Sequence, residues 1–276
     1  MRGEARLRGI IKRLRLTIDV AGNKLIPERT INYHGYKLSY SAGTSIVQRY
    51  KRDGSYEEEV CVNLEKIIAN TPNGTFIDIG ANVGLISLRL LAKNPKLKIH
   101  AFEPGPHQYK LLKKTIQDNN LQPKVKLYSK ALSDKRGSAI FSIHRGEDAS
   151  GDGFMDTGRA GKTTSINVKT ETLDNWWESK GKPQIDLIKI DTEGAEMLIL
   201  KGAKQLIATC KPTFCLEIWP INLKNYPYDA YDIYEMMKKY GYRLETQDGI
   251  KITDKNYPSF VNRESDFIAY ARKQKK

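Results

Sequence analysis

The sequence predicts an α/β fold built around a mostly parallel, doubly wound sheet, and two observations carry this prediction. From Thr75 onward, apolar strings of five to seven residues alternate with segments of helical periodicity, as in consecutive βαβ units. The strings are almost continuously apolar, which is typical of strands covered by helices on both faces. A chain of 276 residues, 39% of them hydrophobic, is long enough to bury a full core around such a sheet.

The expected elements follow one another through this region. The strands lie at 75–80, 97–103, 125–132, 138–145, 185–191, 213–219 and 266–272. The helices lie at 84–93 and 106–119, over a short run at 173–179, from about 194 onward, and at 229–240. Residues 145–164 are polar and rich in glycine, so we expect a long loop there. A loop of that length inside a compact domain either lacks structure or has a function, such as that of a lid.

The first 70 residues have a different character. Residues 31–63 have the pattern of short strands and turns, with an Asp-Gly turn at 53–54, and residues 56–70 that of a helix leading into the first long strand. We therefore expect a small N-terminal strand/helix appendage over residues 1–70 and one main domain over residues 71–276.

The formal net charge of +14 is concentrated at the two ends of the chain. The first fifteen residues hold six basic and one acidic residue, and the last five hold four basic residues. The middle of the chain keeps an ordinary surface charge. Because a basic groove across the middle is not indicated, nucleic acid is a disfavoured partner.

The N-terminal segment has the pattern of a basic amphipathic helix. Leu7, Ile10, Ile11 and Leu14 follow one helical face, and the remaining positions are mostly Arg and Lys. Such a helix can pack on the domain, pair with a second copy in a homo-oligomer, or make peripheral contact with an anionic membrane. Charges interrupt its apolar part, so it is not a secretory signal. Three cysteines without CxxC spacing are expected to be reduced core residues, which favours a cytoplasmic protein, with or without membrane contact.

The stretch FIDIGANVG, from Phe76 to Gly84, has the pattern of a cofactor-binding turn. Asp78 ends a strand that is expected to be buried, where a carboxylate is costly without a partner. In open α/β sheets, ligands bind outside the carboxyl ends of the strands. Gly80 permits a tight turn with close backbone approach, and Gly84 lets the next helix pack near the strand. The second strand ends in Glu103, whose carboxylate suits the two hydroxyls of a ribose.

The spacing of this turn separates the candidate cofactors. A dinucleotide-binding turn reads GxGxxG, and its second glycine makes room for a pyrophosphate. Here Asn82 holds that place and Asp78 precedes the turn, which suits a cationic amino-acid moiety. S-Adenosylmethionine offers the matching groups: an ammonium, a sulfonium and a ribose diol. The alternative is an ordinary strand-turn-helix with a solvated Asp78.

These motifs resemble those of the FkbM family of S-adenosylmethionine-dependent methyltransferases. The matching stretches run in the family's order from about Phe76 to Ile218: FIDIGANVGLISL, AFEPGPHQYKLLKKTI, ALSDKRGSAIF, TETLDNW, DLIKIDTEGAEMLILKGA and CLEI. The family commonly has Glu-Pro-Asn-Pro where this chain has Gly105, so a role for that asparagine does not carry over. The first 70 residues carry no matching motif.

The resemblance implies a Rossmann-like methyltransferase fold over residues 71–276, with O-methyl transfer to a hydroxyl of a sugar, a glycan or a sugar-bearing metabolite. It implies that the amino-acid end of the cofactor contacts the glycine turn, that its ribose contacts the second strand, and that its adenine is flanked by residues after the third strand. By position these residues are Asp78, Gly80, Asn82 and Gly84; Glu103; and Ser133 and Asp134.

Carboxylates at the ends of later strands are the catalytic candidates, because transfer to a hydroxyl needs alignment and a proton acceptor. Asp191 is the first candidate, as general base or as the residue that orients the acceptor, and Glu193 and Glu217 follow. Glu193 could instead favour the start of a helix. Lys189 lies inside the same strand and is expected to contact Asp191 or Glu217, since an unpaired buried Lys is costly. Oxygen ligands could hold a divalent cation, but nothing fixes three of them at one point, so no metal site is assigned.

Two other functions remain open. An RNA methyltransferase is favoured only by the basic ends. A protein that binds S-adenosylmethionine without catalysis is the non-enzymatic alternative, and the intact carboxylate set at 78, 103, 191 and 193 weighs against it.

Overall fold

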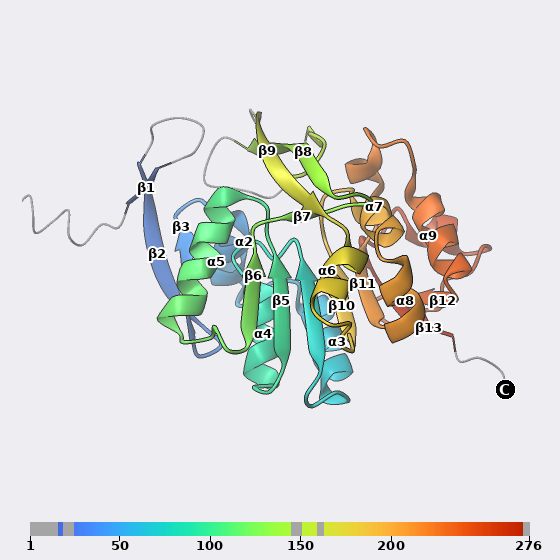
Figure 1. Ribbon diagram of the computed structural model, residues 1–276, viewed down its shortest axis with the longest axis horizontal. Coiled ribbons are helices and arrows are strands. Elements are labelled where there is room, and N and C mark those ends of the chain that lie inside the picture. The colour runs from blue at the N-terminus through green and yellow to red at the C-terminus, as the bar shows by residue number, and fades with distance from the viewer. Residues whose placement is uncertain (1–15, 19–24, 145–150, 159–162, 273–276) are drawn as a thin grey trace, which may run out of the picture.

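The computed structural model describes residues 16–18, 25–144, 151–158 and 163–272 (Figure 1). Among these residues, seven strands form the main sheet in the order β12-β13-β11-β10-β4-β5-β6. Their bounds are β4 Thr75–Ile79, β5 Lys98–Phe102, β6 Val125–Tyr128, β10 Leu187–Ile190, β11 Thr213–Glu217, β12 Tyr242–Glu245 and β13 Asp266–Ala271. Neighbours from β6 to β11 pair in parallel, while β13 pairs antiparallel with both β11 and β12. The predicted α/β, Rossmann-like fold with a mostly parallel sheet is confirmed.

Helices cover both faces of this sheet, as the continuous apolar strands predicted. Strand residues alternate between the two cores: Phe76 packs with one buried cluster and Ile77 with the other. The first cluster contains residues of α3 Glu58–Ala69, α4 Leu85–Lys93 and α5 Pro106–Asp118. The second contains residues of α6 Leu173–Ser179, α7 Glu196–Lys201, α8 Lys204–Cys210 and α9 Ala230–Lys239. Short helices η1 Pro220–Leu223 and α10 Tyr257–Phe260 complete this side.

The N-terminal strands form a small antiparallel sheet beside α5 (Figure 1). Its strands are β1 Leu16–Ile18, β2 Leu25–Tyr33 and β3 Tyr36–Ser41. The backbone N–H of Ser39 donates to Thr115 Oγ1 of α5 at 2.9 Å. Leu38 is fully buried in the same core as Phe76. The hairpin therefore shares a core with the main sheet, and a domain boundary at residue 70 stays a prediction.

Local structure differs from the expectation between residues 45 and 54. This run was expected as strand with an Asp-Gly turn, but it forms helix α2, Ser45–Asp53. Its buried residues, Ile46 and Val47, lie on one side of a helical turn, and Gly54 ends the helix with a φ of 76°. An Asp-Gly pair is compatible with a helix C-terminus as well as with a hairpin, because glycine adopts the left-handed conformation in both.

A second small sheet lies above the main one (Figure 1). Its strands are β7 Ala131–Leu132, β8 Gly137–His144 and β9 Thr163–Glu171, in the order β7-β9-β8. The run expected as one strand over 125–132 is thus divided between two sheets. The expected strand near 138–145 forms, but outside the main sheet, and β9 was not expected.

Two further expectations concern the chain ends and the cysteines. The predicted amphipathic helix over residues 1–15 lies outside the described residues. Within the described ranges, no helix has both the length and the apolar character needed to cross a bilayer. Cys61, Cys210 and Cys215 are buried and free, as predicted for reduced core residues.

Candidate active site

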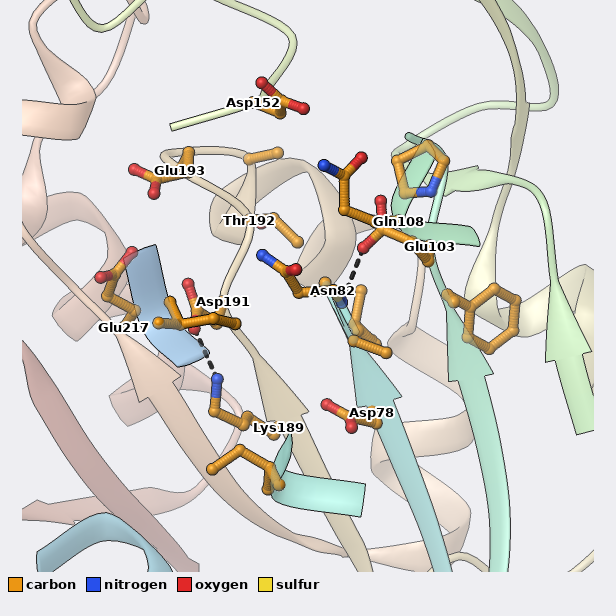
Figure 2. Close-up of a pocket in the computed structure, with 18 of the residues that line it drawn as sticks. Asp78, Asn82, Glu103, Gln108, Asp152, Lys189, Asp191, Thr192, Glu193 and Glu217 are labelled. Carbon is orange, nitrogen blue, oxygen red and sulfur yellow. Dashed lines mark hydrogen bonds and ion pairs between the residues drawn. The ribbon is translucent and has the colours of Figure 1, made fainter. Parts of the chain in front are cut away.

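A cavity of about 440 Å³ lies at the carboxyl ends of β4, β5, β10 and β11 (Figure 2). Asn82, Glu103 and Gln108 line one side of it, and Asp191, Glu193 and Glu217 lie on the opposite side. This is the edge at which an open parallel sheet binds ligands, and the volume is in the range of small-molecule sites.

Asp78, the next-to-last residue of β4, lines the cavity and is 1% exposed. Ser87, on the first turns of α4, donates its hydroxyl to Asp78 Oδ2 at 2.5 Å. The neighbouring strand places Lys189 in register with Asp78. Burial raises the pKa of Asp78, while the charge of Lys189 and the Ser87 hydrogen bond lower it. The buried carboxylate therefore has the partners it needs, and the alternative of a solvated Asp78 does not hold.

Gly80 and Gly84 are both required by close packing in the left-handed region. Gly80 has a φ of 82°, and a Cβ there would lie 1.8 Å from the carbonyl oxygen of Asp191. Gly84 has a φ of 91°, and its Cβ would lie 2.5 Å from Leu112 Cδ1 of α5. The close approach predicted for Gly80 is thus to the backbone that follows β10. Gly84 was expected to let the helix pack near the strand, but its close contact is with α5.

Glu103 is held by backbone donors at the end of β5. Its Oε2 accepts from the N–H of Asn82 at 2.8 Å, and its Oε1 from the N–H of Gly105 at 2.7 Å (Figure 2). Burial raises the pKa of Glu103 to about 8 against the lowering effect of these two hydrogen bonds. A Cβ on Gly105 would lie 2.7 Å from Gln108 Oε1, so the Gln108 side chain takes the space beside this glycine.

The side chain of Asn82 has one oxygen without a hydrogen-bond donor in the described structure. Asn82 has a φ of 49°, and its Oδ1 is buried and makes no hydrogen bond within the described chain. A buried oxygen without a donor is costly, which points to a donor that a ligand supplies.

Lys189 and Asp191 form the ion pair that the sequence predicted. Lys189 Nζ donates to Asp191 Oδ2 at 2.5 Å, and Lys189 is 3% exposed (Figure 2). Burial alone would lower the pKa of Lys189, but the negative charges of Asp191, Glu57 and Asp78 raise it well above its usual range. The lysine is therefore a fixed cation at the centre of several carboxylates.

Glu193 lines the cavity in the loop before α7. It sits in the left-handed region with a φ of 56°, and α7 begins three residues later at Glu196. The carboxylate that holds this loop is that of Glu196. Its Oε1 accepts from the N–H and the hydroxyl of Thr192 at 3.0 and 2.8 Å.

Glu217 ends β11 on the same side of the cavity. Asn222 Nδ2 donates to Glu217 Oε2 at 3.0 Å. Burial raises the pKa of Glu217 well above its usual range, and the charges of Asp191 and Glu193 add to this. The three catalytic candidates therefore lie close enough to influence one another, and Asp191 alone among them contacts Lys189 in the described structure.

Ser133 and Asp134 do not line this cavity. The lining of their segment, as described, is Lys130, Ala131 and Leu132. The N–H of Ser133 donates to Glu171 O in the small sheet, and Asp134 is exposed. After β6 the chain turns away into β7, so the cavity lining falls on the residues just before the pair that the resemblance indicated, and the role of Ser133 and Asp134 beside an adenine stays a prediction.

Residues 151–158 contribute to the wall of the cavity. Phe154 packs edge-on against Phe141, with ring centroids 6.0 Å apart. Asp152 Oδ1 accepts from the N–H of His144 at 2.8 Å and lies 3.0 Å from its Nδ1, and this contact raises the pKa of His144. Asp152 and Phe154 both line the cavity. The remainder of the expected loop, at 145–150 and 159–162, lies outside the described residues.

Several lining residues were missed from the sequence, and all of them except Gln108 lie outside the recognised motifs. They are Arg49, Tyr56, Glu57, Gln108, Asp152, Phe154, Trp219 and Asp266. One signal was available: Trp219 follows the strand that ends in Glu217. Asp266 is the first residue of β13. Because β13 runs antiparallel to β11, the start of β13 lies beside the carboxyl end of β11, a neighbour relationship that only the sheet topology reveals. In the described part of the chain, no group of three or more His, Cys, Asp or Glu residues could hold a metal ion.

Comparison with known proteins gives a family match. The model of the methyltransferase FkbM domain matches residues 78–244. Methyltransferase sdnD from Sordaria araneosa is 30% identical over 171 residues, which is 50% of this chain and 64% of that protein. The 2-O-methyltransferase NoeI from Sinorhizobium fredii is 29% identical over 150 residues, which is 49% of this chain and 60% of that protein. Each match thus covers less than two thirds of the relative.

Solved structures show distant likeness. The methyltransferase FkbM from Methylobacillus flagellatus has 13% identity and a TM-score of 0.47, over 72% of this chain and 44% of that one. The O-methyltransferase from Bacillus cereus has 9% identity and a TM-score of 0.44, over 83% and 89% of the two chains.

Proposed function

The chain belongs to the FkbM family of S-adenosylmethionine-dependent methyltransferases, and we propose that it transfers the methyl group to a hydroxyl of a sugar, a glycan or a sugar-bearing metabolite. The observation that supports this most is the cavity itself. It places a cofactor-binding turn opposite a lysine-held carboxylate, Asp191, at one sheet edge. One relative is named as a 2-O-methyltransferase, which agrees with transfer to oxygen.

The residues of the turn fit S-adenosylmethionine. The unpartnered Asn82 Oδ1 can accept a hydrogen bond from the cofactor, and Glu103 retains lone pairs for the ribose hydroxyls. Asp78 gives this end of the cavity a carboxyl group that suits an ammonium group. Leu132 and Phe141 supply apolar surface for the adenine. When bound, the cofactor supplies a methyl group already activated by its sulfonium.

Asp191 would act on the acceptor. In the transfer, a bond forms between the acceptor oxygen and the methyl carbon, and the carbon–sulfur bond breaks with its electron pair left on sulfur. The hydroxyl proton passes to the Asp191 carboxylate and then to solvent. Lys189 holds this carboxylate in place at 2.5 Å and keeps its orientation fixed. Glu193 and Glu217 are the alternative proton acceptors on the same side.

An RNA acceptor is less compatible with this cavity. Of the described residues, eight carboxyl-bearing side chains and three cationic ones line it. Although the whole chain carries a formal charge of +14, the reaction site is acidic. A phosphate backbone would be repelled here rather than attracted.

The experiment that tests this function follows labelled methyl from S-adenosylmethionine into a panel of glycans, glycolipids and RNA. We expect label in a hydroxyl-bearing sugar. Label confined to RNA would favour the alternative enzyme, and binding of the cofactor without transfer to any acceptor in the panel would favour the non-catalytic alternative. We further propose that the reaction takes place in the cytoplasm, with peripheral membrane contact through the basic N-terminal segment.

A further inference from the structure

One end of the cavity is built by segments outside the matched family region of residues 78–244. Tyr56 and Glu57 come from the link before α3, and Asp266 comes from the start of β13. Glu217 at the end of β11 completes this end. We call Glu57, Glu217 and Asp266 the acidic end of the cavity. The acidic end is distinct from the glycine turn and from Glu103, which are assigned to the cofactor.

The acidic end gathers three carboxyl groups close to one buried cation, Lys189, whose charge lowers the pKa of Glu57 and of Asp266 against the larger effect of burial. Burial raises the pKa of Glu57, and it raises that of Asp266 to about 7, with the charge of Glu57 adding to the effect. The same cause raises the pKa of Glu217. Lys189 is buried nearby, but its ammonium contacts Asp191. Arg49 is exposed and lies 5.9 Å from the centre of the Tyr56 ring, at the rim.

An atom without a partner points to a ligand at this end. Glu57 Oε2 is buried and makes no hydrogen bond within the described chain, while the neighbouring Tyr56 hydroxyl interacts with the Glu57 carboxyl and lowers its pKa. Glu57 itself adopts a left-handed conformation, with a φ of 45°, directly before α3. A buried carboxylate oxygen without a donor is costly, and a strained backbone that holds it there adds to the cost. A donor supplied by a ligand would offset both.

We propose that the acidic end is the acceptor subsite, and that the acceptor carries an ammonium group near the hydroxyl that is methylated, as an amino sugar does. This rests on the proposed function. Charged hydrogen bonds from an ammonium match the carboxylates of Glu57, Asp266 and Glu217 in a way that a neutral hydroxyl does not. An acceptor with a carboxylate or phosphate at the same position is disfavoured by repulsion.

The same charges select oxygen as the methylated atom. An amine held among carboxylates keeps its proton, because nearby negative charge favours the cationic form. A protonated amine has no lone pair to form a bond with the methyl carbon. The adjacent hydroxyl keeps its lone pairs, forms the new carbon–oxygen bond and passes its proton to Asp191, while the electron pair of the broken carbon–sulfur bond stays on sulfur.

The test measures binding, which does not depend on turnover. The full-length protein, saturated with S-adenosylhomocysteine, is titrated calorimetrically with three probes: methyl glucoside, methyl glucosaminide, which has an amine in place of the 2-hydroxyl, and methyl glucuronide, which has a carboxylate in place of the C6 hydroxymethyl group. We expect the glucosaminide to bind about tenfold more tightly than the glucoside, the scale of one charged hydrogen bond, and the glucuronide to bind most weakly. Equal affinities for the first two, or tighter binding of the glucuronide, would overturn the proposal.

Variants localise the effect. Glu57→Gln and Asp266→Asn should each reduce the preference for glucosaminide over glucoside by about tenfold. The matched control is Glu59→Gln, which changes an exposed residue two positions from Glu57 and should leave the preference unchanged. A preference that survives both cavity variants would place the ammonium elsewhere and contradict the proposal. Absence of methyl transfer with all sugars would instead count against the proposed function, because the binding preference is read separately.

Discussion

The carbonyl oxygen of Asp191 occupies the space in which a side chain on Gly80 would begin. A Cβ on this glycine would lie only 1.8 Å from that oxygen, at a φ of 82°. In addition, the N–H of Asp191 donates to Ile79 O at 3.1 Å. Backbone contacts therefore join the cofactor-binding turn to the end of β10, which precedes the catalytic candidate. These contacts fix the distance between the two halves of the site.

The first prediction concerns this contact. Gly80→Ala should lower the free energy of unfolding by more than about 3 kcal/mol, because it combines left-handed strain with a backbone clash. The control is Gly54→Ala, since Gly54 has a similar φ of 76° but nothing within 4 Å of its Cβ. Gly54→Ala should lower the free energy of unfolding by only about 1 kcal/mol. Denaturant titration of both variants measures the difference, and equal losses would show that strain alone matters.

Glu103 is expected to bind the cofactor ribose. Glu103→Ala should weaken the binding of S-adenosylmethionine and of S-adenosylhomocysteine by about 1–3 kcal/mol, the cost of leaving a buried hydrogen-bonding partner unsatisfied. Calorimetry measures this, and Glu178→Gln on an exposed helical position is a suitable control. Unchanged affinity in the Ala variant would remove Glu103 from the ribose site.

The raised pKa of Glu103 also predicts a pH dependence of stability. Its folded pKa of about 8 exceeds its ordinary value of 4.5 because of burial. The folded state therefore holds a proton that the unfolded state releases, so stability falls as pH rises from about 5 to 8. Relative to Glu103→Gln, the wild type should lose up to about 1.4 kcal/mol per pH unit in this window. The free energy of unfolding of both proteins is measured by denaturant titration across this pH window. The same pH dependence in the two proteins would contradict the prediction.

Asp191 is predicted to act in transfer and not in cofactor binding. Asp191→Asn keeps the shape of the side chain, and turnover should fall by roughly 10²- to 10⁴-fold, the range typical of a lost general base. Cofactor affinity, measured by calorimetry, should stay near that of the wild type. A large loss of affinity would move Asp191 to the cofactor site. Near-normal turnover would transfer the role of base to Glu193 or Glu217, which the corresponding Gln variants would separate.

The basic N-terminal segment is predicted to affect location and not chemistry. Deleting residues 1–15 should reduce binding to anionic vesicles, and high salt should have the same effect through screening. Cofactor affinity should not change. Cosedimentation with vesicles at two salt concentrations checks the first point. A truncated protein that loses its fold or its cofactor would show that the segment belongs to the core.

Much of the fold and of the cofactor side of the site could be predicted from the sequence, because these features depend on local patterns. The apolar strand ending in Asp78, the Gly80 turn and the carboxylate at 103 follow one another within 26 residues. The Lys189–Asp191 pair follows from the alternation of one strand and the cost of a lone buried cation. Each of these inferences needs only neighbouring residues.

The acceptor side could not be predicted in this way, because it assembles from distant segments. Glu57 and Asp266 are 209 positions apart in the sequence, and they lie at one cavity only because β13 runs antiparallel beside β11. The run at 45–54 was misread because an Asp-Gly pair ends a helix as readily as it forms a hairpin. The cavity lining ends at Leu132, just before Ser133 and Asp134, because the chain leaves the main sheet after β6 to form β7, a change of sheet that no local pattern marks.

The most direct test of the central claim locates the transferred methyl group. The protein is incubated with carbon-13 methyl-labelled S-adenosylmethionine and an amino-sugar glycan, and the product is examined by NMR, which distinguishes a methyl ether from a methylamine by chemical shift. We predict that the wild type converts the hydroxyl next to an unmodified amine into a methyl ether, and that the Asp191→Asn variant does not form this product. Label on nitrogen, or the same product at the same rate from the Asp191→Asn variant, would contradict this prediction.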